Sequence, residues 1–307
     1  MTQRNLQQTV MLLGMTIFAL VASTTTTHAQ IHDQQAGSGL IYNYFTSDSV
    51  TPWGQNTTFT ITNTNTTTLT QVRMFYVNGD TGAVKTNSIC LPAGATWSGL
   101  MSDENPDVTG YIVALAIDSS GAPRNFNWLI GNAAITINSG HRATLSAIAW
   151  SFEGPPAANQ LTVDRVPSPL DGQMPLLIIN RINGTLVNQM VALGNVTGVV
   201  TVNEGRAVPS NFPFTLNSSG PQLRRVIDDS LPLSGTTLST VIPGGRTAFM
   251  KLNSGINIVT GAILYFSPNT GISTGSFTGG NNLRHTGFTN QSLTVPIIKP
   301  LRCFLFF

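Results

Sequence analysis

The sequence predicts an all-β protein made of two tandem antiparallel β-sandwich modules. Three observations lead to this fold class. Short apolar runs alternate with turn residues, one set of motifs recurs in both halves of the chain, and no segment between the runs has the period of an amphipathic helix. The composition agrees, because 29 Gly and 17 Pro residues favour turns, while only 9% of the residues are charged.

The amino terminus has the pattern of a secretory signal peptide, residues 1–29. Arg4 is its single charged residue, an apolar run covers Met11–Ala22, and small residues precede a cleavage point after Ala29. The run is shorter than the roughly 20 residues that a membrane span requires. We therefore expect a secreted protein, extracellular, periplasmic or on the cell surface, without stable membrane insertion. A short uncleaved anchor is the alternative.

The strand candidates follow the predicted cleavage point at short intervals. In Thr58–Thr62, Phe59 and Ile61 share one face and threonines take the other, as in an antiparallel strand with one face in water. Further runs, each bounded by turn residues, predict strands at Val72–Val77, Tyr111–Ile117, Asn125–Ile130, Ala134–Ile137 and Ala143–Trp150. Short strands at this spacing are typical of a sandwich.

An internal repeat indicates that the sandwich occurs twice. A shift of 151 residues superimposes three motifs, namely Gln71 with Gln222, Pro92-x-Gly94 with Pro243-x-Gly245, and Val108–Gly110 with Val259–Gly261. Since chance rarely keeps one register over several motifs, we interpret the chain as two copies of one β-module. Each Pro-x-Gly segment is expected to form a turn that leads into a strand.

The module boundaries follow from the repeat and from a proline-containing segment. We place a first module at residues 30–152, a linker at 153–160 and a second module at 161–303, because adjacent prolines favour an extended connection. All four tryptophans lie in the first module, so a ligand bound through aromatic side chains is expected there. A last strand should run to about Pro300, and the apolar end should pack on the second module or form an exposed patch.

The repeat register also suggests roles for two unusual residues. Cys90 aligns with Val241, which favours a small buried hydrophobic residue over a disulfide to Cys303, although the disulfide stays an alternative. Trp97 aligns with Ala248, so its role is expected to be local to the first module.

A resemblance to known proteins is carried by three segments, NTTFTITNTNTTTLTQVRMFYVNG, ICLPAGATWSGL and DVTGYIVALAID. A strand ending in Asn-Thr repeats, an apolar strand and an LPAG corner together resemble bacterial immunoglobulin-like surface modules. The chain is also similar to an uncharacterised family of secreted bacterial β-sandwich proteins with VTGYIVA and LIG segments. The resemblance implies a secreted β-sandwich of immunoglobulin-like type and supplies no catalytic residues.

Aromatic residues of the first module are the candidate ligand-binding site. Tyr42 and Tyr44, with Trp53 in a Pro-Trp-Gly loop, predict a stacking surface for sugar rings or an anchor for a protein partner. The alternative is that both tyrosines cover the core from an edge strand. Trp97, which precedes an acidic loop, is a further candidate.

That acidic loop, Asp103-Glu104-Asn105-Pro106-Asp107, concentrates three carboxylates in a charge-poor chain. Asp103, Glu104 and Asp107 are candidate ligands for Ca²⁺, which prefers oxygen donors, although their spacing lacks the pattern of a calcium-binding loop. A solvated loop that aids solubility is the alternative. A hydrolase that uses these carboxylates is a second functional hypothesis.

Other chemistry has little support in the sequence. Gly271–Gly275 matches the G-x-S-x-G pattern, but no helix is predicted after the serine. The 15 basic and 13 acidic residues nearly balance, which argues against nucleic acid as a partner. We therefore expect a non-catalytic interaction or scaffold protein whose partner is a surface protein or a glycan, with a carbohydrate-binding protein and a secreted hydrolase as the alternatives.

Overall fold

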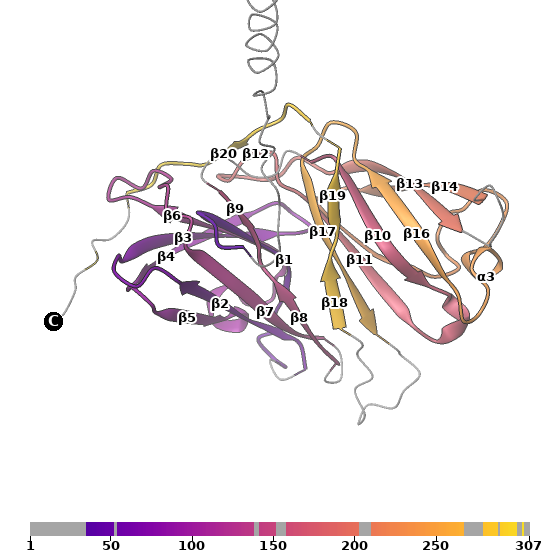
Figure 1. Ribbon diagram of the computed structural model, residues 1–307, viewed down its shortest axis with the longest axis horizontal. Helices are drawn as coiled ribbons and strands as arrows, with labels where there is room; N and C mark the ends of the chain where they lie inside the picture. Colours follow the sequence, from indigo (N-terminus) through magenta and orange to yellow (C-terminus); the bar gives the residue numbers. More distant parts are fainter. Residues whose placement is uncertain are drawn as a thin grey trace, which may run out of the picture. The chain divides into compact units, whose positions relative to one another are not determined.

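Antiparallel β-sheets make up most of the regular structure (Figure 1). The computed structural model describes residues 35–51, 54–137, 141–151, 158–202, 210–266, 279–287, 289–299 and 303. The predicted signal peptide and most of the predicted linker lie outside these residues. The described residues belong to one compact unit, and none of their helices is long and apolar enough to cross a membrane.

The first sandwich contains the strands up to β9, in two sheets. Sheet A has the order β4-β3-β6-β1-β9, and sheet B has the order β5-β2-β7-β8. The strands are β1 (Gly39–Thr46), β2 (Asn56–Asn63), β3 (Thr70–Asn78), β4 (Val84–Leu91), β5 (Thr96–Leu100), β6 (Thr109–Ile117), β7 (Leu129–Ile137), β8 (His141–Ser146) and β9 (Ile148–Trp150). A one-turn helix, α2 (Met101–Glu104), joins β5 to β6.

The second sandwich repeats this plan. Sheet C has the order β14-β13-β16-β10-β19, and sheet D has the order β15-β11-β17-β18. The strands are β10 (Gln160–Pro167), β11 (Met174–Arg181), β13 (Gly194–Val202), β14 (Ser210–Ser218), β15 (Gln222–Val226), β16 (Thr247–Asn253), β17 (Val259–Phe266), β18 (Gly279–Asn282) and β19 (Arg284–Thr286). Short elements connect them, namely η1 (Pro169–Asp171), β12 (Gly184–Thr185), α3 (Leu238–Val241) and β20 (Leu293–Thr294), which pairs in parallel with β12.

The two sandwiches are copies of one topology. Matching the sheet orders pairs β1 with β10, β3 with β13 and β6 with β16, and every other strand of sheets A and B likewise finds its counterpart in chain order. A local irregularity is repeated as well. The pairing register shifts between Tyr42 and Phe45 in β1 and between Val163 and Val166 in β10, which is the same place 121 residues later. Since bulges are specific features of a strand, this supports a duplication.

The predicted duplication is therefore confirmed as a topology, but the predicted 151-residue register is wrong. Both Pro-x-Gly turns exist, with Gly94 and Gly245 at φ of 68° and 74°. The first turn leads into β5 and the second into β16, whose counterpart in the first sandwich is β6. The same kind of turn thus occurs at two different points of the fold, because a sharp entry into a strand requires the same residue types wherever it lies.

Three predicted strands also differ from the structure. The segments 125–130 and 134–137 contribute to one strand, β7, which begins at Leu129 and passes through Gly131 without a break. A Cβ atom at residue 131 would lie 2.1 Å from the hydroxyl oxygen of Tyr42, so glycine here provides space and does not end the strand. The predicted strand 143–150 is divided between β8 and β9, which belong to different sheets.

Sheet A is buried on both faces. Met74 and Tyr76 of β3 face the interior between sheets A and B, whereas Phe75 and Val77 face a separate apolar cluster on the other side. That second cluster is completed by Ile182 and other residues of the chain between β11 and β13, and by the segment that contains β20. Burial on two faces explains why β1, β3 and β6 are nearly continuous apolar runs, whereas the edge strand β4 is polar and mostly exposed or half-buried.

Sheet D is buried in the same way. Leu177 and Ile179 of β11 face the core of the second sandwich, while Ile178 between them joins the core of the first. Ala262 and Leu264 of β17 also join the first core. The two sandwiches therefore share apolar packing, and sheets B and C are the layers that keep one face free of it.

A terminal strap, defined here as residues 289–299 with Cys303, lies on the first sandwich. Leu293 and Val295 pack against the cluster outside sheet A, and the carbonyl oxygen of Ile298 lies where a Cβ of residue 121 would be. A disulfide joins Cys303 to Cys90 on β4, with the Cα atoms 5.8 Å apart. The strap also contacts the second sandwich, since β20 pairs with β12 and the Thr289 hydroxyl donates to the backbone oxygen of Ile256. Apart from Cys303, the apolar end that was predicted to pack on the second module or to form an exposed patch lies outside the described residues.

The prediction that Cys90 is a buried hydrophobic residue is wrong too. Cys90 is exposed and bonded to Cys303 across 213 residues of sequence. The comparison with Val241 was misleading, because Val241 lies in α3 and has no structural relation to β4. The bond indicates an oxidising compartment, extracellular or periplasmic.

Candidate functional site

The tyrosines predicted to form a stacking surface are inside the first sandwich. Tyr42 and Tyr44 are 2% and 6% exposed, because β1 lies between β6 and β9 and not at a sheet edge. Tyr42 packs edge-on against Phe59 and donates a hydrogen bond of 2.6 Å to the carbonyl oxygen of Thr60, while burial raises its pKa. These two side chains are not available for stacking on a ligand. Trp53 lies outside the described residues.

Trp97 covers a glycine at the margin of the core. Its half-buried ring lies edge-on to Phe59, with 5.2 Å between ring centroids. The ring also fills the space that a Cβ atom at residue 99, a glycine, would occupy. The local role expected for Trp97 is therefore packing across sheet B. Trp128 is more exposed than Trp97, at 48%, although no sequence pattern indicated it as a binding residue.

The three carboxylates of the acidic loop are not gathered into one cluster. The described residues contain no group of three or more acidic, histidine or cysteine side chains arranged to hold an ion. Glu104 accepts hydrogen bonds of 2.9 Å from the Tyr76 hydroxyl and from Asn87. Asp107 instead accepts from the backbone and hydroxyl of Ser49.

These bonds give two of the three carboxylates a structural role. Burial raises the pKa of Tyr76, so its hydroxyl stays protonated and continues to donate to Glu104. Asp107 itself has a positive φ of 59°, a conformation in which Asp is tolerated. Asp103 is exposed. The predicted calcium site is not supported by this arrangement.

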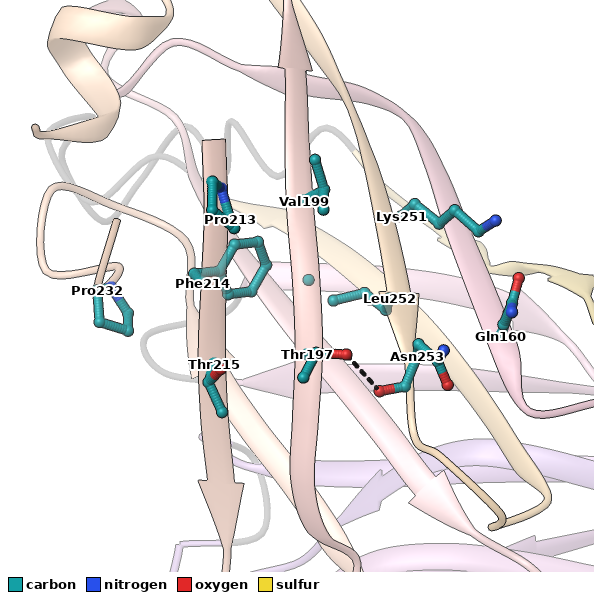
Figure 2. A pocket seen from close by; sticks show the side chains of 11 residues that line it. Gln160, Thr197, Val199, Pro213, Phe214, Thr215, Pro232, Lys251, Leu252 and Asn253 are labelled. Carbon is teal, nitrogen blue, oxygen red and sulfur yellow. Dashed lines mark hydrogen bonds between the residues drawn. The ribbon is translucent and has the colours of Figure 1, made fainter. Parts of the chain in front are cut away.

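A hollowed surface lies on the second sandwich, at the outer face of sheet C. A depression of about 640 Å³ follows β13 (Figure 2). Thr197 and Val199 lie in the middle, Pro213 on one side, and Lys251 and Asn253 on the other. We call this depression the sheet C groove.

The groove follows from the strand pattern. In β13, Val196, Gly198 and Val200 turn inward to the second core, so the residues between them turn outward. The outward residues are small, while the neighbouring strands carry proline on one side and longer polar side chains on the other. The depression is thus built from a regular sheet and is open to solvent.

The polar groups that line the groove differ in whether they are already bonded. Thr197 donates a hydrogen bond of 3.4 Å to the backbone oxygen of Asn253, whose side-chain oxygen accepts from Gly255. The side chains of Gln160, Lys251 and Thr215 have no protein partner among the described residues. Amide, hydroxyl and ammonium groups therefore face solvent together.

The strands of sheet C carry an excess of basic residues. Their sequences contain Lys251, Arg165 and Arg284 and a single acid, Asp164. Thr162 pairs with both Lys251 and Arg284, which places these two cations on one face, about 10 Å apart across three strands. Asp164 lies beyond them, at the bulge of β10.

No family model and no curated protein sequence matches this chain.

Sequence reasoning missed the sheet C groove, and the signal it needed was only partly present. Alternation in β13 and β16 does predict that Thr197, Val199 and Lys251 share one face. Whether that face is free depends on which sheets the other sandwich and the strap cover. The G-x-S-x-G segment at Gly271–Gly275 lies outside the described residues.

Proposed function

We propose that the protein is an exported, non-catalytic interaction or scaffold protein, in which the duplicated sandwiches act together. The observation that carries this proposal is the difference in burial between the four sheets. The central strands of sheets A and D are packed on both faces, whereas sheets B and C each keep a broad exposed face with polar side chains. Such faces are the surfaces that a partner can reach.

The composition and the disulfide support the location and the type of partner. An oxidised Cys90–Cys303 bond suits an extracellular or periplasmic protein, and the proposed final place is the medium, the periplasm or the cell surface. A chain with 9% charged residues and near-balanced charge is poorly suited to nucleic acid. We propose a surface protein or a glycan as the partner, and no stable membrane insertion.

Two alternative functions, carbohydrate binding by the first sandwich and hydrolysis by the acidic loop, have less support. Carbohydrate binding through Tyr42 and Tyr44 requires accessible rings, and both rings are buried. Of the three carboxylates that a hydrolase in the acidic loop would use, Glu104 and Asp107 already accept hydrogen bonds from within the fold, and Asp103 is exposed.

Export, binding and turnover can be measured on the same protein. The full chain is produced in a secreting bacterial host, fractionated, and the exported protein is tested for sedimentation with envelope and extracellular polysaccharides and for hydrolysis of polysaccharides and esters. We expect an amino terminus after Ala29, saturable binding and no turnover. Turnover that disappears in Glu104→Gln or Asp107→Asn, or an absence of saturable binding, contradicts the proposal.

A further inference from the structure

We propose that the sheet C groove binds an acidic polysaccharide, that is, a chain of sugar rings that carries carboxylates. This inference rests on the proposed interaction function and names the site and the class of ligand. It also moves glycan recognition from the aromatic residues of the first sandwich to the outer face of sheet C in the second.

The polar groups of the groove suit a polyhydroxyl ligand. Gln160 and Asn253 each present an amide, which both donates and accepts, and Thr197 and Thr215 add hydroxyls. Sugar hydroxyls also donate and accept, so they match these side chains better than a ligand with acceptors alone. The groups come from four neighbouring strands and are held at the fixed spacings of a sheet.

The apolar side of the groove suits the carbon face of a sugar ring. Pro213, Pro232 and Val199 form a strip next to the polar groups (Figure 2). Their contact with ring C–H groups would bury apolar surface without leaving polar groups unsatisfied. Because the depression follows a strand and is open, it favours an extended chain over a small enclosed ligand.

The charge of the face selects an acidic ligand. Lys251 makes no ion pair among the described residues, and Arg284 carries a second positive charge two strands away on the same face. Lys251 is the charged residue of the groove lining, while Arg284 and the single acid of these strands, Asp164, both lie outside that lining. Asp164 is followed directly by Arg165 at the bulge of β10, so the net charge beside the groove stays positive. Carboxylates spaced along a polysaccharide can reach both cations at once.

The test uses polygalacturonate as the acidic polysaccharide, its methyl ester as the neutral form and poly-L-glutamate as an acidic polymer without sugar rings. Binding to the exported full chain is measured by calorimetry at low and physiological salt. We expect polygalacturonate to bind, salt to weaken it, and both other polymers to bind more weakly.

Variants then locate the site. Lys251→Gln with Arg284→Gln should weaken binding of polygalacturonate about fivefold or more, and Val199→Trp, which fills the groove, should abolish it. Arg142→Gln is the matched control, because it removes one exposed charge from the outer face of sheet B. Thermal unfolding confirms that each variant is folded.

Each contrary result has a distinct meaning. If the methyl ester binds as tightly as polygalacturonate, charge does not select the ligand and the proposed ligand class is wrong. If poly-L-glutamate binds as tightly, the groove recognises acidic polymers such as acidic peptides, and the sugar ring has no role. No binding of polygalacturonate, or groove variants that bind like the wild type, overturns the proposal. In these cases the interaction function stands if the exported protein still sediments with envelope material, and falls with the proposal if it does not.

Discussion

Asn43 links the two sandwiches through a single bulge. The register shift in β1 turns this buried side chain toward sheet D, where its amide donates hydrogen bonds of 2.9 Å to Gly261 and 2.8 Å to Asn282. Asn180 in turn donates to the backbone oxygen of Asn43 and accepts from Gln222. Buried amides are costly unless bonded, so this network fixes how the sandwiches meet.

Removing one amide tests the network. Asn180→Ala should lower the free energy of unfolding by about 1 to 3 kcal/mol, because the Asn43 carbonyl and the Gln222 amide lose their partner in a dry site. Urea unfolding measures the change. Asn195→Ala, an exposed position on β13, is the control and should be nearly neutral; equal effects of both substitutions would show that the network adds no stability.

His285 should make the protein less stable in mild acid. It lies on β19, its Nε2 atom is buried although the residue as a whole is half-buried, and burial lowers its pKa to about 4. The unfolded chain has the ordinary value of 6.5 and therefore binds the proton first as the pH falls. The stability contributed by neutral His285 is full above about pH 6.5 and declines until about pH 4.

The size of this effect is up to about 3 kcal/mol. His285→Gln cannot titrate, so its stability should fall less than that of the wild type over this pH range. Urea midpoints measured from pH 7 to pH 4 supply the comparison, with the exposed neighbour Arg284→Gln as control. Parallel pH profiles of wild type and His285→Gln would refute the assignment.

Among the elements, the terminal strap depends on one covalent bond. β20 pairs with β12 over two residues, and Ile297 is 68% exposed, so few non-covalent contacts hold this part of the chain. The Cys90–Cys303 bond closes a loop of 213 residues. Such a crosslink restricts the unfolded chain strongly.

Loss of that bond should release the strap. The Cys90→Ser, Cys303→Ser double variant should unfold with about 3 to 5 kcal/mol less free energy, and its amide exchange should rise around Leu186 and Leu293 before it rises in β3. Dithiothreitol should reproduce the change in the wild type and leave the double variant unaffected. Unchanged exchange at Leu186 and Leu293 would show that packing alone holds the strap.

How far the sequence predicts these elements depends on their surroundings. β2 was predictable because Phe59 and Ile61 alternate with threonines, and β3 because its Val72–Val77 segment is nearly all apolar. β7 was divided at Gly131, since the chain alone does not reveal that the Tyr42 hydroxyl occupies that space. For the candidate site, the sequence predicts the alternation of side chains in β13, but it does not predict that the outer face of sheet C is free of packing.

At the scale of the whole molecule, the duplication was predictable and its register was not. The Pro-x-Gly turns recur because turn chemistry is local, whereas the repeated bulge after Tyr42 and after Val163 becomes visible only through strand pairing. Aliphatic side chains replace one another freely in a core, so the two copies retain little alignable sequence. The two sandwiches therefore share a strand topology, although their sequences no longer align along it.

The central claim is that both sandwiches act as one unit through shared packing and buried hydrogen bonds. All four tryptophans precede β10, so tryptophan fluorescence reports the first sandwich, while far-UV circular dichroism reports both. We expect urea unfolding of the oxidised protein to give the same midpoint by both methods. A separate fluorescence transition, or two steps by circular dichroism, would contradict the claim.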